Sequence, residues 1–182
     1  VNFRHLQEMR NTYRMMVDTY RKDPLTGLLN RTGFYHVVQT LMENSSDLEM
    51  SVIMMDMDHL KMVNDTFGHM EGDFALRTLG NIVKNSVGQE LAARIGGDEF
   101  LIVLTGEHTS KRAKTIVEAM REGIRQHNLQ NPDKGYELQA SIGTYTNHVG
   151  NHMLDYFMKK ADDIMYAIKY RHHRELPVTQ EP

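Results

Sequence analysis

The sequence predicts an α/β domain in which a mixed central sheet of about four strands is surrounded by helices. In several long segments, apolar side chains recur every three to four residues, which is typical of helices with one buried face. Short apolar runs lie between these segments, and two of them flank the glycine pair at 96–97, as in a tight hairpin. Helices alternating with strands, one pair of which forms a hairpin, favour a split βαβ arrangement.

Length and composition agree with one domain and an appendage. Of 182 residues, 40% are hydrophobic and 25% are charged, which excludes a disordered or collagen-like chain. Cysteine is absent, so disulfides, zinc–thiolate sites and cysteine nucleophiles are excluded. The net charge of -3 provides no broad basic surface, and we expect no DNA or RNA partner.

The apolar runs are all short. The longest, at 52–55 and 100–104, are far below the roughly 20 residues that cross a bilayer. We therefore expect a soluble, cytoplasmic fragment without membrane contact. Because it begins at Val1 without a signal peptide, we also expect a longer chain upstream, which a membrane could anchor.

Residues 1–22 are predicted to form a stem helix. Its apolar side chains make an a/d stripe of about two heptads: Leu6, Met9, Tyr13, Met16 and Tyr20. The stripe favours coiled-coil pairing with a second copy, and packing on its own domain is the alternative. The stem ends at Asp23-Pro24, because the residue before a proline avoids the helical region.

A turn, a helix and a strand follow the stem. The turn spans 23–30, and Asn30 is a suitable N-cap for a helix that runs to about Met42. MSVIMMDM at 50–57 predicts a buried strand that ends in acid. The first acidic side chains of chemical interest therefore lie at a strand end.

Two helices are predicted next. Asp58 is interpreted as the N-cap of a short helix over 59–65, and ligand binding is the alternative role for its carboxylate. A loop at 66–69 separates this helix from one over 71–87, in which apolar residues recur at helical spacing.

The rest of the domain repeats the alternation of strands and helices. Strands at 91–95 and 99–104 form the hairpin, and an amphipathic helix follows over 109–126. Residues 136–145 alternate like a half-buried strand, and apolar residues between 154 and 168 mark the last helix.

Acidic side chains occur in three places. Asp56 and Asp58 end a buried strand, Asp98 and Glu99 lie at the hairpin tip, and Asp73 lies in the first turn of a helix. Carboxylates at a strand end and on a neighbouring hairpin can converge on Mg²⁺ when substrate phosphates supply the other oxygens. Taken alone, an acid in a first helical turn also complements the helix dipole. The two glycines before the hairpin acids let a phosphate-bearing ligand approach the backbone.

RIGGDEF at 94–100 resembles the signature of the GGDEF family, the diguanylate cyclases that condense two GTP into cyclic di-GMP and two pyrophosphates. Four more segments match the family in order and spacing: DPLTGLLNR at 23–31, DMDHLKMVNDTFGHMEGD at 56–73, ASIG at 140–143 and ADDIMYAIK at 161–169. The resemblance implies a ferredoxin-like fold similar to the palm of nucleotide polymerases. It divides the chain into a stem at 1–22, a cyclase domain at 23–176 and a frayed tail at 177–182.

The resemblance also implies roles for single residues. The metal, Mg²⁺ or Mn²⁺ in its place, is expected to bind Asp56, the Met57 carbonyl, Asp98 and Glu99, and the catalytic residues are expected to be Asp98, Glu99 and Lys61. Asn64 and Asp73 match the guanine-recognising pair, and a carboxylate is suited to accept from guanine N1–H and N2–H₂. Other expected substrate contacts are His59, Leu60, His69, Lys169, His173 and Arg174.

Two positions depart from the family. His172-His173-Arg174 replaces the usual Gly-Arg-Asn, so either His173 or Arg174 substitutes for the phosphate-binding arginine or triphosphate affinity is weaker. Val87 and Glu90 occupy the places of the inhibitory Arg-x-x-Asp site, so strong product inhibition through that site is not expected.

The expected function is an active, Mg²⁺-dependent diguanylate cyclase that acts as a homodimer, because each site holds one GTP and the reaction needs two. An upstream sensor domain would drive it through the stem. The main alternative is a weak or inactive module that binds GTP and regulates a neighbouring domain. A second alternative is an enzyme that makes mixed cyclic dinucleotides, but Asp73 favours guanine.

Overall fold

The computed structural model describes residues 20–43 and 48–175, the last three of these by their backbone alone. The stem stripe from Leu6 to Met16 and the tail from residue 177 lie outside these residues, so both stay predictions. Among the described helices, none has the length and apolar character needed to cross a membrane.

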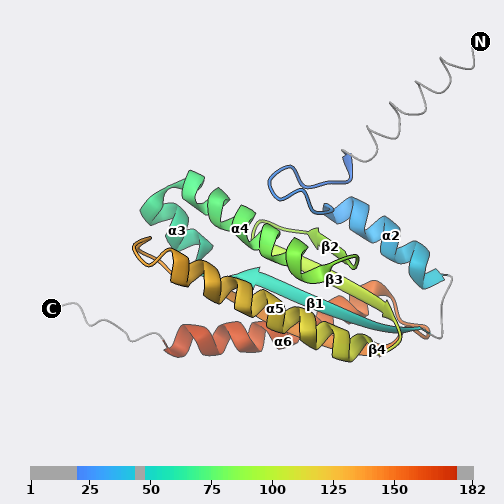
Figure 1. Cartoon of the computed structure of the whole chain (residues 1–182). Helices are drawn as coiled ribbons and strands as arrows, with labels where there is room; N and C mark the ends of the chain where they lie inside the picture. The colour runs from blue at the N-terminus through green and yellow to red at the C-terminus, as the bar shows by residue number, and fades with distance from the viewer. Residues whose placement is uncertain (1–19, 44–47, 176–182) are drawn as a thin grey trace, which may run out of the picture.

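Four antiparallel strands form one sheet in the order β2-β3-β1-β4 (Figure 1). They are β1 (Glu49–Met57), β2 (Leu91–Arg94), β3 (Glu99–Gly106) and β4 (Ala140–His148). In the described part of the chain, parallel pairing is limited to a bridge between Leu29 and Ala93. The predicted fold class, a central sheet surrounded by helices with one hairpin, is confirmed, but the four strands pair antiparallel where a mixed sheet was expected.

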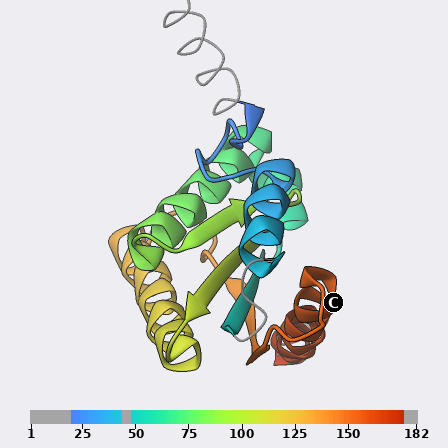
Figure 2. The same cartoon turned by 90° about the vertical axis from the view of Figure 1, so that its right-hand side faces the viewer.

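The helices cover both faces of the sheet. They are α2 (Arg31–Glu43), α3 (Leu60–Phe67), α4 (His69–Val87), α5 (Thr109–Gln130) and α6 (Leu154–Glu175). Figure 2 shows α4 and α5 on one side of the sheet and α2 and α6 on the other. Each face has its own apolar core, which explains why the sequence alternates amphipathic helices with apolar strands.

The central strand β1 is buried on both faces. Its residues from Met50 to Met57 are all buried, and successive side chains enter opposite cores. Ile53 and Met55 pack toward α4 and α5, whereas Val52 and Met54 pack toward α2 and α6. This two-sided burial explains why the sequence here is a continuous apolar run.

The predicted caps have mixed outcomes. Asn30 does cap α2, because its Oδ1 accepts a hydrogen bond from the backbone N–H of Gly33 at 2.8 Å. The prediction that Asp58 caps the next helix is wrong. The N-cap of α3 is His59, in a left-handed conformation with φ 61°, and its side chain makes no capping hydrogen bond. The carboxylate of Asp58 is instead used inside the fold, where Ser141 donates to it.

Two predicted boundaries also shift. The loop expected at 66–69 is a single residue, Gly68, which ends α3 and begins α4. The strand expected from residue 136 begins at Ala140. Before it, the side-chain amide of Asn128 satisfies both the N–H and the carbonyl of Leu138 at 2.9 Å, so that backbone pairs with a helix side chain rather than with β1.

Candidate active site

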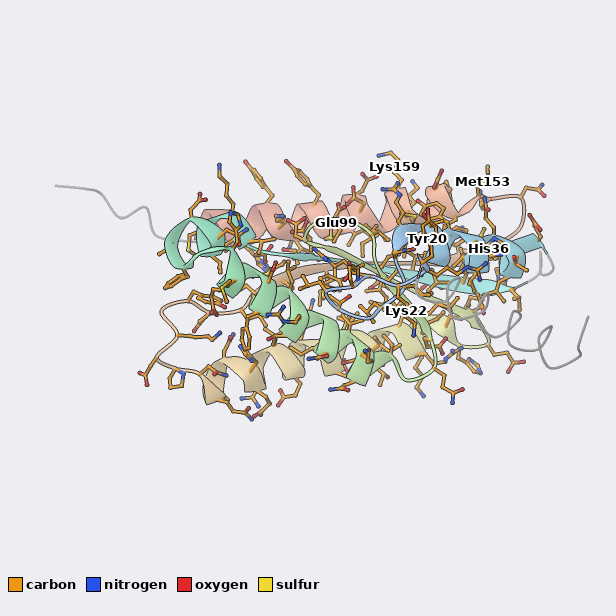
Figure 3. All side chains as sticks on the ribbon, turned by 90° about the horizontal axis from the view of Figure 1, so that it is seen from above. Tyr20, Lys22, His36, Glu99, Met153 and Lys159 are labelled. Atoms are coloured by element: carbon orange, nitrogen blue, oxygen red, sulfur yellow. The ribbon has the colours of Figure 1, made fainter. Side chains whose placement is uncertain are left out.

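The candidate active site begins where β1 and β3 lie beside each other at the signature hairpin. Asp56 of β1 is directly opposite Glu99 of β3, and the N–H of Met57 donates to the carbonyl of Asp98 at 3.0 Å. The structure therefore brings the two acidic segments together, as predicted. In the view from above, Glu99 lies between the ribbons of α4 and α6 (Figure 3).

Asp56 is a buried carboxylate in an unfavourable electrostatic environment. Its side chain is 9% exposed, and burial raises its pKa to about 6. The ammonium group of Lys169 contacts Asp56 Oδ1 and opposes this rise, whereas the neighbouring charges of Asp98 and Asp58 add to it. The same carboxylates raise the pKa of Lys169 in spite of its partial burial. A second cation in this position would be stabilised by the same carboxylates.

Asp58 lies deeper, with its side chain fully buried. The hydroxyl of Ser141 donates to both of its carboxylate oxygens at 2.9 and 3.0 Å, and His172 Nδ1 lies 3.3 Å from Oδ2. The backbone N–H of Asp58 donates to the carbonyl of Gln139. These contacts join the end of β1 to β4 and α6, and they give Asp58 a structural role.

The hairpin tip depends on its glycines. A Cβ on Gly96 would lie 2.5 Å from Oε2 of Glu99, so the glutamate side chain lies directly over this residue. A Cβ on Gly97 would meet nothing within 4 Å. The side-chain direction at Gly97 is therefore unobstructed, and the approach of a phosphate-bearing ligand to this backbone stays a prediction.

Arg94 connects this hairpin to the turn at residue 23. Its Nε and Nη2 donate to the carbonyl of Gly97 at 3.1 and 2.8 Å, and its Nη1 donates to Asp23 at 3.0 Å. Asp23 also accepts from the N–H and the hydroxyl of Thr26. The turn that follows the predicted stem and the tip of the signature hairpin are thus held by one guanidinium group.

The proposed guanine residues lie at the corner between α3 and α4, beside the end of β1 (Figure 1). Gly68 joins the helices, and its N–H donates to the carbonyl of Asn64. A Cβ on Gly72 would lie 1.8 Å from Oδ1 of Asn64, so only glycine leaves room for the amide. Asp73 follows directly and is exposed. The corner thus holds Asn64 beside the start of the helix that carries Asp73.

Other predicted substrate residues lie at the surface. Lys61 and His69 are exposed, and neither contacts the carboxylates in the described part of the chain. Leu60 is half-buried at the start of α3, after the left-handed residue His59. The predicted substrate contacts of Lys61, His69, His59 and Leu60 stay predictions. The side chains of His173 and Arg174 lie outside the described residues.

The donor set suits Mg²⁺ better than a metal that needs a complete protein cage. In the described residues, no group of three or more His, Asp or Glu side chains is arranged to hold a metal by itself. Mg²⁺ is commonly held by one or two carboxylates and substrate phosphates. Asp56, Asp98 and the Met57 carbonyl fit this requirement, and the raised pKa of Asp56 agrees with a site built for an added cation.

Sequence reasoning assigned no role to Arg94 or Ser141, although both lie inside the matched segments. Arg94 is the first residue of the RIGGDEF segment, and a charged residue at the end of a short strand near two glycines is a weak signal of such a contact. Ser141 lies in a half-buried strand, and only the register of β4 against β1 shows that it is opposite Asp56 and near Asp58.

The family model for the diguanylate cyclase GGDEF domain matches residues 20–175. The chain belongs to the GGDEF family. Its match spans the sheet, the helices and the hairpin site, so the expected membership is confirmed.

Two relatives illustrate the likeness. Probable diguanylate cyclase DgcT of Escherichia coli K12 is 33% identical over 151 residues, which cover 81% of this chain and 33% of that protein. Diguanylate cyclase DgcM of the same strain is 29% identical over 150 residues, which cover 81% of this chain and 35% of that protein. The chain thus spans about a third of the length of these curated relatives.

Solved structures agree in fold. The GGDEF domain of DgcB from Caulobacter crescentus, in complex with c-di-GMP, is 26% identical with a TM-score of 0.75, covering 84% of this chain and 89% of that one. The coiled coil and GGDEF domain of the same protein has a TM-score of 0.81 at 24% identity, covering 92% and 90%.

Proposed function

We propose that this GGDEF chain is the catalytic output domain of a diguanylate cyclase, which condenses two GTP into cyclic di-GMP and two pyrophosphates. The observation that carries the proposal is the meeting of Asp56 and Asp98 at the ends of β1 and β3. Burial and neighbouring acids raise the pKa of Asp56 to about 6, which is costly without a cation. Two sources supply cationic charge to this cluster: the ammonium of Lys169 and, in the proposed enzyme, Mg²⁺ or Mn²⁺.

The proposed metal would be held by Asp56, Asp98 and the Met57 carbonyl. When bound, it would neutralise charge on the GTP phosphates and polarise the α-phosphate. Lys169, which contacts Asp56, would supply positive charge to the phosphates, and Lys61 is the second proposed phosphate contact. Asn64 and Asp73 would accept and donate hydrogen bonds along the guanine edge.

The reaction forms one bond and breaks another in each half. The 3'-hydroxyl oxygen of one GTP bonds to the α-phosphorus of the other, and the bond from that phosphorus to pyrophosphate breaks. The hydroxyl proton passes to a base, for which Glu99 is the candidate because its carboxylate lies over Gly96 at the hairpin tip. Repetition with the roles exchanged closes the ring.

Because one domain holds one GTP, the proposed enzyme works as a homodimer. Two domains would face each other with their nucleotides between them. We propose that an upstream sensor domain controls this meeting through the stem, in the cytoplasm where GTP is available. The exchange of the family's Gly-Arg-Asn for His172-His173-Arg174 favours one other function, a module that binds GTP but turns it over weakly.

The proposal is tested by incubating the chain with GTP and Mg²⁺ and identifying the products by chromatography. We expect cyclic di-GMP and pyrophosphate from the wild type and none from Asp98→Ala or Asp56→Ala. Asp163→Ala is the matched control, because Asp163 is an exposed acid on α6 that only pairs with Lys159. GTP binding without any cyclic product would favour the regulatory module, and near wild-type turnover by either site variant would remove the metal assignment.

A further inference from the structure

The corner between α3 and α4 is packed where Leu60 and Asn64 of α3 lie against Gly72 of α4. α3 has eight residues, of which Val63 is the buried one. The joint is Gly68, whose carbonyl accepts from the N–H groups of Glu71 and Gly72 at 3.1 and 3.2 Å. One glycine between two helices leaves their relative angle soft unless side chains fix it. Side chains from outside the corner add a further constraint on this angle.

The loop between α5 and β4 provides this constraint. The carboxylate oxygen Oε1 of Glu71 accepts from the hydroxyl of Tyr136 at 2.7 Å and from the ammonium of Lys134. The same ammonium lies 3.6 Å from the ring centre of Phe74. Phe67, the last residue of α3, packs its ring 5.3 Å from that of Tyr136. The loop thus contacts the end of one helix and the first turns of the next.

The pKa values of Glu71 and Tyr136 are both shifted in this cluster. Hydrogen bonds from Lys134 and Tyr136 lower the pKa of Glu71, and burial together with the acceptor Glu71 raises the pKa of Tyr136. Both groups are therefore fixed in one protonation state near neutral pH, with the carboxylate charged and the phenol neutral.

The loop is itself anchored at both ends. On the helix side, the Asn128 amide bonds both the N–H and the carbonyl of Leu138, and Leu138 is buried. Beyond it, the carbonyl of Gln139 accepts from the N–H of Asp58 at the end of β1. Because the loop is fixed both to α5 and to the end of β1, its contacts can hold the corner between α3 and α4 in one position.

The cluster does not touch the proposed nucleotide residues. Glu71 and Asp73 are two positions apart on α4, so their side chains leave the helix on nearly opposite sides. Asn64 lies against Gly72, the residue between Glu71 and Asp73 in the sequence. An effect of the cluster on the nucleotide must therefore act through the orientation of α3 and α4.

We propose that Glu71, Lys134 and Tyr136 are positioning residues for guanine selectivity, because they hold the corner at the angle that aligns Asn64 with Asp73. This inference rests on the proposed function, in which those two residues bind the base. It assigns the α5–β4 loop a part in choosing the nucleotide, although the loop makes no contact with the proposed base-recognising residues in the described part of the chain.

The test measures base discrimination at equilibrium, without turnover. The full chain is titrated with the α,β-methylene analogues of GTP and ITP, which cannot release pyrophosphate, and ITP lacks only the 2-amino group. We expect Tyr136→Ala combined with Lys134→Ala to reduce the GTP-to-ITP affinity ratio by about tenfold, because the ratio depends on the hydrogen bond to the 2-amino group, which a misaligned corner weakens. Tyr136→Phe with Lys134→Arg, which retains ring packing and charge, should recover most of the ratio.

Two controls separate this effect from general destabilisation. Val83→Ala removes buried volume from α4 far from the corner in sequence, and Glu122→Gln breaks an exposed ion pair on α5. Both should keep the wild-type affinity ratio. An unchanged ratio in the double alanine variant, or an equal loss in Val83→Ala, overturns the inference alone. A wild-type chain that binds neither analogue overturns the proposed function, and the inference with it.

Discussion

At the residue scale, the buried carboxylate of Asp56, which the proposed metal site needs, lowers the stability of the fold when it is charged. Its pKa rises from 3.8 to about 6, so the folded state binds a proton more tightly than the unfolded state between those values. The unfolding free energy therefore falls as pH rises through this window, and the full penalty is present above pH 6. At about 1.4 kcal/mol per pKa unit, the penalty is at most about 3 kcal/mol.

Asp56→Asn should therefore stabilise the chain in the absence of divalent metal. We expect urea unfolding in EDTA to show a gain that is larger at about pH 8 than at about pH 5, by roughly 1 kcal/mol, because only the wild-type carboxylate loses its proton in between. Asp163→Asn, at an exposed site, serves as the control. An Asp56→Asn variant that is less stable than wild type at pH 8 would contradict the electrostatic account.

Gly72 makes a second residue-scale prediction. Alanine there would place a Cβ 1.8 Å from Oδ1 of Asn64 and force the amide away. We expect Gly72→Ala to weaken GTP binding about tenfold or more, whereas Asn81→Ala at an exposed position of α4 has little effect. In a double-mutant cycle, Gly72→Ala should cost nothing further once Asn64 is already alanine. Additive losses would show that the two residues act separately.

At the element scale, Arg94 fastens the signature hairpin to the N-terminal turn. Its guanidinium makes three hydrogen bonds to two acceptors, which a lysine ammonium cannot reproduce. Arg94→Lys should lower the unfolding free energy by about 1–2 kcal/mol, because a partly buried charged contact is lost. It should also slow cyclisation, since the hairpin tip is no longer held.

Arg125→Lys is the matched control for this change. Arg125 pairs with Glu122 at the surface of α5, where both side chains are more than half exposed, and such pairs contribute little. Urea unfolding and initial rates measure the two effects. If the Arg94 and Arg125 variants had the same unfolding free energy and initial rate, the contacts of Arg94 would not be needed to hold the hairpin.

The elements also show how far sequence reasoning reaches. Strongly periodic segments such as α4 and the continuous apolar run of β1 were predicted almost to their ends. The Asp58 cap was wrong because a local pattern cannot show that Ser141, eighty-three positions away, offers this carboxylate a partner inside the fold. The start of β4 was placed too early because the Asn128 amide, not a strand, satisfies the backbone at Leu138.

Some contacts of the candidate site could be predicted from the sequence, and others are visible only in the structure. The hairpin and the acidic strand end were predicted from the sequence, together with the possibility that their carboxylates converge. Only the structure shows that β1 and β3 are neighbours in the sheet. The contacts of Arg94 with Asp23 and of Tyr136 with Glu71 join segments 71 and 65 positions apart. Only the folded chain brings such segments together.

At the scale of the whole molecule, the proposed reaction depends on the meeting of two chains. A paired stem would raise the local concentration of one domain near the other, so specific activity should climb with protein concentration. Met9→Glu with Met16→Glu should lower activity most at low concentration, because like charges on the stripe oppose pairing. Initial rates of the intact chain, this variant and a chain starting at Lys22 measure the effect. If the three chains had equal specific activities that did not change with protein concentration, residues 1–22 would not assist assembly.

Control by product is a second prediction at this scale. Val87 is buried in the core, and Glu90 is paired with Arg112, so neither offers the free arginine and aspartate of the family's inhibitory site. Added cyclic di-GMP should inhibit only by competing with GTP. Rates at several GTP concentrations distinguish the two cases, because inhibition that high GTP cannot relieve would reveal another product site.

The burial of β1 divides the proposed site into parts with different opening energies. A central strand that is hydrogen-bonded on both sides opens only with the core of the domain, whereas α3, an eight-residue helix in which Val63 is the buried residue, can open at a smaller cost. The carboxylates at the end of β1 therefore belong to the most slowly exchanging unit, and Asn64 and Asp73 belong to a corner that can exchange sooner. Changes that loosen the proposed base recognition can accumulate there without loss of the carboxylates of the proposed metal site.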